Sequence, residues 1–96
     1  MKTIAIHTYT GSFAENKDVA RGIRLEKIMP AVEANEMVII DFTGVDSATQ
    51  SFVHALLSDV IRVHSNSALD LLQFKSCNET IQKIITIVLD YMQESL

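Results

Sequence analysis

The sequence predicts a small α/β fold in which helices pack on a short mixed or parallel sheet. Segments rich in β-branched residues alternate with segments of helical periodicity, in the order βαβαβα. Such alternation is typical of parallel or mixed sheets covered by helices. The chain has 96 residues, which is enough for one domain and too few for two. We therefore expect residues 1–96 to form a single domain.

Composition and charge narrow the class of protein. The formal net charge is -4, and no basic run marks a surface for a phosphate backbone, so we expect no nucleic-acid partner. The longest apolar stretch near the C-terminus, residues 84–89, is far shorter than the ~20 residues that cross a bilayer. No secretory signal is evident, and the single cysteine, Cys77, fits a reducing compartment. The predicted location is the cytoplasm, with no membrane partner.

The first half of the chain predicts a strand and a kinked helix. Residues 3–9 are rich in β-branched side chains and stop before Gly11, which indicates a strand. Asn16 or Ser12 can cap a helix that begins near Lys17. Apolar residues recur at helical spacing over residues 19–34. Pro30 lacks an amide donor, so we expect a kink or a break there, with Pro30 starting a short last turn.

The second half predicts two further strands and two further helices. Residues 36–42 are the clearest predicted strand, and the apolar run within them is continuous, which indicates a strand covered on both faces. We expect a helix over about 51–64, a turn at 65–67 and a strand over 69–75. Asn78 is the expected cap of the last helix. That helix carries an apolar stripe at three- and four-residue intervals: Ile81, Ile84, Ile85, Val88 and Met92.

The loop between the second strand and the second helix is rich in hydroxyl groups: Thr43, Ser47, Thr49 and Ser51. Such a loop leads into a helix N-terminus, where free backbone amides and the helix dipole suit a phosphate or a partner carboxylate. The alternative is that Thr49 or Ser51 only caps the helix, which contributes ~1 kcal/mol. The sequence leaves both interpretations open.

No pattern of residues indicates catalysis or metal binding. The three histidines show no short metal-ligand spacing, and no phosphate-binding, nucleophile-elbow or paired-cysteine motif occurs. Asp41 is expected to accept backbone amides of the following turn, and Cys77 to be a small structural thiol. We therefore expect a protein that is not an enzyme and that uses no cofactor or metal.

Residues 38–52, which read Val-Ile-Ile-Asp-Phe-Thr-Gly-Val-Asp-Ser-Ala-Thr-Gln-Ser-Phe, resemble the central strand, loop and helix of STAS domains. These domains are named for sulfate transporters and anti-sigma factor antagonists. The chain more closely resembles the STAS-like family of short bacterial proteins. There the loop reads Gly-Val, four variable residues, Gln, Ser or Ala, and Phe, and a turn similar to Cys77-Asn78 precedes the last helix. The pair Ala20-Arg21 also fits that family.

The resemblance departs from the anti-sigma factor antagonists at the regulatory position. Aligned with them, Gln50 takes the place of the phosphorylated serine, and Thr49 takes the place of the aspartate before it. Phosphorylation is therefore not assigned to Gln50. Ser51 and Thr49 are the remaining candidate phosphorylation sites, provided that the register slips by one residue.

The resemblance implies a regulatory module that binds another protein, similar to an anti-sigma factor antagonist. The implied partner is a histidine-kinase-type ATPase or an anti-sigma-like protein. The expected contact surface is the loop 43–51 with the exposed side of the following helix: Thr43, Ser47, Thr49, Gln50, Ser51, His54, Ser58 and Arg62. Two alternatives remain open, a domain that binds a nucleotide or an anion at the same helix N-terminus and a protein that forms a homodimer.

Overall fold

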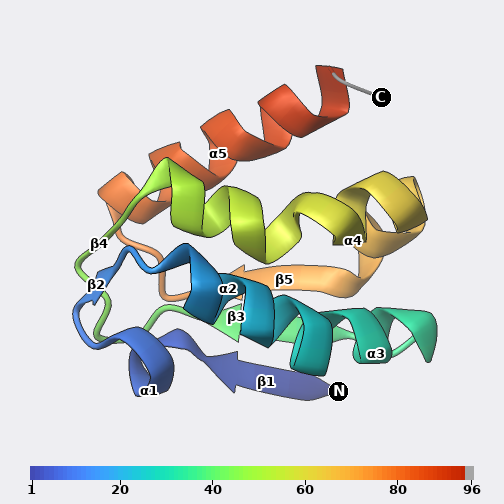
Figure 1. Ribbon diagram of the computed structural model, residues 1–96, viewed down its shortest axis with the longest axis horizontal. Coiled ribbons are helices and arrows are strands. Elements are labelled where there is room, and N and C mark those ends of the chain that lie inside the picture. The colour runs from blue at the N-terminus through green and yellow to red at the C-terminus, as the bar shows by residue number, and fades with distance from the viewer. Residues whose placement is uncertain (95–96) are drawn as a thin grey trace.

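The computed structural model describes residues 1–94, without the side chains of residues 65–67, 93 and 94. Its centre is a parallel sheet of three strands in the order β1-β3-β5 (Figure 1). These strands are β1 (Lys2–Ala5), β3 (Val38–Asp41) and β5 (Leu72–Lys75). Two short strands, β2 (Phe13–Ala14) and β4 (Ser47–Ala48), form a second parallel pair. The predicted α/β class with parallel strands is confirmed.

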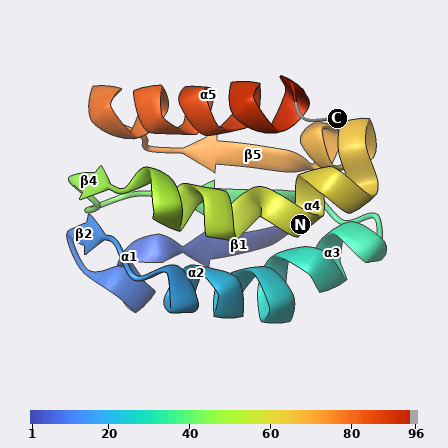
Figure 2. The ribbon, with the colours of Figure 1, turned by 45° about the horizontal axis from the view of Figure 1, so that its top comes forward.

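Helical segments fill the connections between the strands. They are α1 (Ile6–Thr10), α2 (Lys17–Ile23), the π-helical segment η1 (Arg24–Ile28), α3 (Met29–Glu33), α4 (Gln50–Leu71) and α5 (Glu79–Glu94). The connection from β1 to β3 contains α2, η1 and α3, and the connection from β3 to β5 contains α4. After β5, α5 lies along the β5 side of the sheet and packs against α4 (Figure 2).

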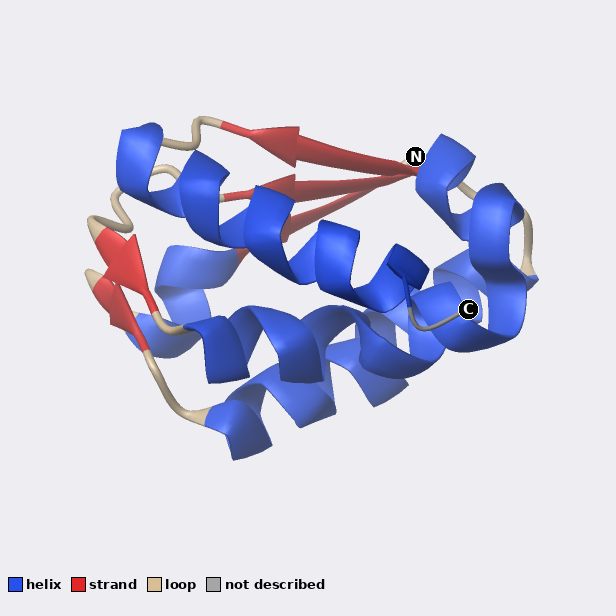
Figure 3. Cartoon of the chain, turned by 90° about the horizontal axis from the view of Figure 1, so that it is seen from above, coloured by secondary structure: helices blue, strands red, loops and turns tan. Residues whose placement is uncertain are grey.

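The helices cover one face of the sheet, as Figure 3 shows from above. The strand order follows the chain order, so two right-handed crossovers that advance in the same direction fall on the same face. Val38 and Ile40 point to that face and are buried, whereas Ile39 is only half-buried. The prediction that both faces of this strand are covered is therefore wrong. Its apolar run reflects a central position between two strands and not two helical layers.

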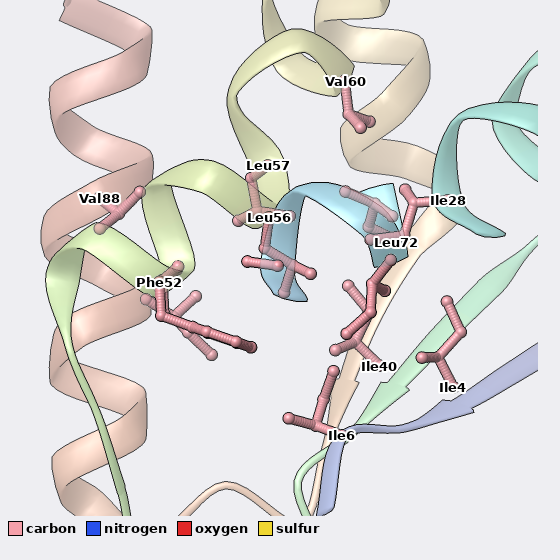
Figure 4. Close-up of a cluster of buried hydrophobic side chains, with 14 of the residues drawn as sticks. Ile4, Ile6, Ile28, Ile40, Phe52, Leu56, Leu57, Val60, Leu72 and Val88 are labelled. Atoms are coloured by element: carbon pink, nitrogen blue, oxygen red, sulfur yellow. The ribbon is translucent and has the colours of Figure 1, made fainter. Parts of the chain in front are cut away.

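A single apolar core lies between the sheet and the helices (Figure 4). Ile4 and Ile40 project from the sheet toward Phe52 and Leu56 of α4, and all four are at most 3% exposed. Burying one such side chain contributes about 1.5–3 kcal/mol. Because α4 contacts α2, η1, α3 and α5, it is the helix around which the other helices are arranged.

The first strand is shorter than predicted. Its register with β3 ends at the pair Ala5 and Asp41, so Ile6 has no strand residue opposite it. The chain instead turns into α1, which buries Ile6 completely. Gly11 closes this turn with φ 72°, and its amide donates to the His7 carbonyl at 2.9 Å. The β-branched composition of residues 3–9 was outweighed by the absence of a pairing partner.

The kinked helix follows the prediction. The Asn16 side chain caps α2 by accepting the amides of Asp18 and Val19 at 2.9 and 3.3 Å. Pro30 lies in the first turn of α3, directly after the wider π-helical turns of η1. A proline leaves the carbonyl four residues earlier without its helical donor, and a π-bulge is one way for a helix to accommodate such a defect.

The second helix is longer than predicted. α4 continues to Leu71, through the residues 65–67 that were expected to form a turn. β5 pairs with β3 only from Leu72 onward, so residues 69–71 have no strand beside them. Ala68 is fully buried, and Leu69 and Leu71 pack against the core. Tertiary burial at helical spacing therefore outweighs the turn preference of serine and asparagine.

Two glycines give opposite predictions for stability. Gly44 has φ 83°, and a Cβ there would lie 3.1 Å from Cδ2 of His7. We expect Gly44→Ala to lower the free energy of unfolding by about 1–2 kcal/mol, the cost of a left-handed conformation. Gly22 lies within α2 with nothing within 4 Å of such a Cβ. We expect Gly22→Ala to raise the free energy of unfolding by about 0.5–1 kcal/mol.

Urea denaturation of the two variants and the wild type measures both effects. Equal effects of the two substitutions, or a stabilised Gly44→Ala variant, would contradict the described conformation of the loop after β3.

Candidate functional site

A groove lies between the N-terminal half of α4 and the C-terminal half of α5. It has a volume of about 470 Å³ and is lined by Lys17, Gln50, Ser51, His54, Ala55, Ile87, Val88 and Tyr91. Tyr91 and Ile87, one helical turn apart on α5, are 62% and 49% exposed. The lining therefore combines an apolar rim on α5 with polar groups on α4 and a cation from α2. Ligand pockets commonly have volumes in this range.

A second hollow of about 220 Å³ continues along the same two helices. Its lining comprises His54, Ser58, Asp59, Ile61, Arg62, Tyr91 and Met92. His54 and Tyr91 line both hollows, and their rings form a tilted pair with centroids 6.2 Å apart. The two hollows are thus neighbouring parts of one surface, which we call the α4–α5 groove.

The two hydroxyl groups at the start of α4 have different environments. The Thr49 hydroxyl oxygen accepts the Phe52 amide at 3.1 Å, so Thr49 caps the helix and is half-buried. Ser51 is exposed, lines the groove, and forms no hydrogen bond through its side chain with any described residue. The capping interpretation therefore holds for Thr49, whereas Ser51 faces the groove.

The other polar residues of the loop face different surroundings. Thr43 donates through its amide and its hydroxyl to Asp41 Oδ1, at 2.9 and 2.6 Å. These hydrogen bonds lower the pKa of Asp41 from its ordinary value, and the bond from the hydroxyl has the larger effect. The charge of Lys75 lowers this pKa further, by a smaller amount.

Ser47 and Asn78 are held at other places along the loop. Ser47 lies in β4, beside β2. Asn78 donates to the Asp46 carbonyl at 2.8 Å and accepts the Ile81 amide at 2.9 Å. It therefore caps α5 as predicted and joins that helix to the loop.

A buried arginine fixes α4 from behind the groove. Arg24 of η1 is 8% exposed. Its Nη1 donates to the Ala55 carbonyl and to the Ser58 hydroxyl, both at 2.7 Å, and its Nη2 lies 3.5 Å from Asp59 Oδ2. Arg62 donates to the other oxygen of Asp59 at 2.9 Å. Asp59 is therefore shared by two arginines, and the N-terminal half of α4 is held by a charged anchor.

Five of the predicted surface residues are brought together in the groove: Gln50, Ser51, His54, Ser58 and Arg62. Thr43, Ser47 and Thr49 do not line it. The predicted exposed side of α4 therefore identified more residues of the groove than the hydroxyl content of the loop did. Ser58 is half-buried, and its hydroxyl oxygen accepts a hydrogen bond from Arg24.

The sequence reasoning missed the rest of the groove. Ile87 and Tyr91 are four residues apart and lie outside the apolar stripe of α5. Their spacing could have indicated a second apolar face on this helix. Arg24 shares the spacing of Ala20 and Ile28, so its place on the buried face was also readable. Nothing in the sequence indicates that Lys17 reaches the start of α4.

The described part of the chain contains no cluster that indicates a metal or thiol chemistry. Among these residues, no group of three histidine, cysteine, aspartate or glutamate side chains lies in a position to hold a metal ion. Burial raises the pKa of the Cys77 thiol, and the charge of Asp41 adds to this effect. A thiol with a raised pKa forms little thiolate at neutral pH, which is unfavourable for a nucleophile.

A family model for a STAS-like domain of unknown function matches residues 20–82, well over half of the chain. The chain belongs to this family. The match runs from the second turn of α2 into α5 and so includes Arg24, β3, the loop 43–51 and the whole of α4. Comparison with curated proteins and with solved structures found no match.

The family membership confirms the resemblance stated from the sequence. A parallel sheet with helices packed on it is consistent with a STAS-like domain. The matched region includes the α4 side of the groove. Lys17, Ile87 and Tyr91 line the groove but lie outside the matched region. In the part of the chain that the structure describes, no helix has the length and hydropathy needed to span a membrane.

The arginine anchor predicts unequal effects for two arginines that contact the same carboxylate. We expect Arg24→Met to lower the free energy of unfolding by about 1.5–3 kcal/mol, because two hydrogen bonds to a buried charged group are lost. Arg62 is exposed, so Arg62→Met should change the free energy of unfolding by only about 0–1 kcal/mol. Urea denaturation provides the comparison. If both variants lose the same stability, Arg24 does not anchor α4.

The contacts of Asp41 predict a pH effect. Because its pKa is lowered on folding, the charged carboxylate stabilises the protein above the pKa of an unfolded aspartate. That contribution is lost as the pH falls through the lower pKa of the folded state. Thr43→Val removes the hydroxyl donor, so it should raise the pKa of Asp41, as measured by an NMR titration of the carboxyl carbon. Thr86→Val, which removes a hydroxyl on the exposed side of α5, should leave that pKa unchanged.

Proposed function

We propose that this STAS-like domain is a non-enzymatic regulatory module that binds another protein through the α4–α5 groove. The observation that carries the proposal is the convergence of Gln50, Ser51 and His54 with the exposed apolar rim of α5. Large exposed apolar side chains beside polar groups are typical of protein-binding surfaces. The resemblance to anti-sigma factor antagonists suggests a histidine-kinase-type ATPase or an anti-sigma-like protein as the partner, in the cytoplasm of a bacterium.

The open face of the sheet is less suited to binding a partner than the groove. The open side of the sheet carries the exposed residues Thr3, Ala5, Gln73 and Lys75 and, on the central strand, the half-buried Ile39 and Asp41, so that only Ala5 and Ile39 are apolar. Such a face is compatible with water and offers little apolar area to a partner. The groove has both an apolar rim and a polar wall, the combination that gives an interface affinity and orientation.

Site-specific photocrosslinking in cells of the source organism tests the proposal. A photoreactive amino acid at Gln50 or Ser51 should give a crosslinked complex, whereas the same amino acid at Thr3 or Gln73 should give none. His54→Glu should reduce the crosslink from Gln50, because it puts a charge beside the aromatic ring of Tyr91. Crosslinks that form equally from both faces, or only from the sheet face, would contradict the proposal.

Phosphorylation, if it regulates this surface, fits Ser51 better than Thr49. The Ser51 hydroxyl is exposed within the groove, whereas that of Thr49 caps α4. A phosphate would add negative charge to the hollow that Lys17 also lines and change what the groove binds. The intact mass of protein purified from its own cells should then show one added phosphate, which Ser51→Ala removes and Thr49→Ser retains. Retention of the phosphate in Ser51→Ala would assign it elsewhere.

The volume of the first hollow favours a second candidate function, the binding of a nucleotide or another small anion. Lys17 and the amides at the start of α4 offer a positive end, and Tyr91 offers a ring for stacking. Thermal denaturation with ATP or inorganic phosphate tests this alternative. A ligand at 100 times its dissociation constant adds about 2.7 kcal/mol of stability. An unchanged midpoint at millimolar concentrations of both compounds would exclude these two ligands.

A further inference from the structure

The charged residues that line the α4–α5 groove have a positive sum, whereas the net charge of the whole chain is negative. The formal net charge of the chain is -4. The charged residues that line the two hollows are Lys17, Asp59 and Arg62. Asp59, the one carboxylate among them, is already in contact with Arg62 and with the buried Arg24. The groove is therefore a locally positive surface on an acidic protein, and it complements negative charge.

Both walls of the groove are helix faces. α4 contributes Ser51, His54, Ser58 and Arg62, at intervals of three or four residues, and α5 contributes Ile87 and Tyr91, four residues apart. Side chains at this spacing form ridges between which the ridges of a further helix pack. From Ser51 to Arg62 the wall extends for about 17 Å, which matches a helix of about three turns.

The apolar part of the groove indicates how such a helix would be held. Ile87 and Tyr91 are exposed, whereas Val88 and Met92 beneath them are 4% and 7% exposed. A helix that inserts one or two apolar side chains here covers exposed apolar area without disturbing the core. Lys17 lies at one end of the groove and Arg62 at the other, so acidic residues near both ends of the incoming helix would face a cation.

We propose that the occupant of the α4–α5 groove is an acidic amphipathic helix of the partner protein. This inference rests on the proposed function and specifies the chemistry of the partner segment. The helix places apolar side chains against Ile87 and Tyr91 and carboxylates toward Lys17 and Arg62. It becomes a third helix alongside α4 and α5, on the side that faces away from the sheet.

Selection from a display library tests the inference with a defined probe. The full chain is used as bait for peptides of about 14 residues, a length that spans the groove as a helix. Enriched peptides should carry apolar residues three and four positions apart together with glutamate or aspartate. A proline in the middle of an enriched peptide should abolish binding, because it breaks a helix. Enrichment of basic peptides, enrichment of peptides that tolerate the proline, or no enrichment would overturn the inference.

Two pairs of matched variants locate the binding site. Lys17→Glu should weaken binding of an enriched peptide about tenfold at low salt, whereas Lys83→Glu makes the same change of net charge outside the groove and should leave binding unchanged. Ile87→Glu should abolish binding. Val63→Glu replaces another exposed apolar residue, 59% exposed and outside the groove, and should not. Equal effects within either pair would overturn the assignment to the groove.

Sedimentation equilibrium separates this inference from self-association. If a second copy of the chain occupies the groove, the wild type is a dimer and Ile87→Glu is a monomer, and the inference of an acidic partner helix fails. Photocrosslinking from Gln50 would then join two copies of this chain and no other protein. If those crosslinks form with another protein but the selected peptides are basic or extended, the proposed function stands and only the partner chemistry proposed here is wrong.

Discussion

The arrangement of this domain depends on the handedness of its two crossover connections. Three parallel strands follow one another across the sheet in chain order, and right-handed connections then place both intervening helical segments on one face. α4 has the sheet beneath it, α2 and η1 on one side and α5 on the other. Among its exposed side chains, Gln50, Ser51, His54 and Arg62 line one wall of the groove.

The same constraint explains where a binding site can form. In many open α/β sheets, ligands bind at the carboxyl edge, at the point where neighbouring connections leave toward opposite faces. That point is absent among the three paired strands here, because both connections leave toward the same face. The loop after β3 is instead held in place by three sets of contacts. These are the hydrogen bond from Asn78, the hydrogen bonds of Thr43 to Asp41 and the pairing of β2 with β4. The α4–α5 groove, in contrast, lies between two helices and away from this edge of the sheet.

Several features of this structure were readable from local chemistry alone. Asn16 and Asn78 were expected to cap helices and do so, and Pro30 was expected to disturb its helix and follows a π-helical segment. These predictions depend on a residue and its immediate neighbours. The end of β1 at Ala5 and the extension of α4 to Leu71 depend on how long β3 is. Such limits are set by a partner strand that is distant in sequence.

The site was readable only in part for the same reason. Helical periodicity placed His54, Ser58 and Arg62 on an exposed side of α4, but it gave no information on what stands opposite. Lys17 and Tyr91 reach that surface from elements far away in the chain. The spacing of Arg24 with Ala20 and Ile28 placed it on the buried face, but it did not indicate which groups would pair with its charge. Its partners, Ser58 and Asp59, lie more than 30 residues along the chain.

The central claim is that the partner of this STAS-like domain contacts the helical side through the α4–α5 groove. Hydrogen–deuterium exchange of the domain, alone and in complex with its purified partner, tests this most directly. The account predicts that the complex slows exchange in residues 50–62 of α4 and in the last turns of α5, with no change in β1 or β5. Slower exchange confined to the strands, with α4 and α5 unchanged, would contradict it.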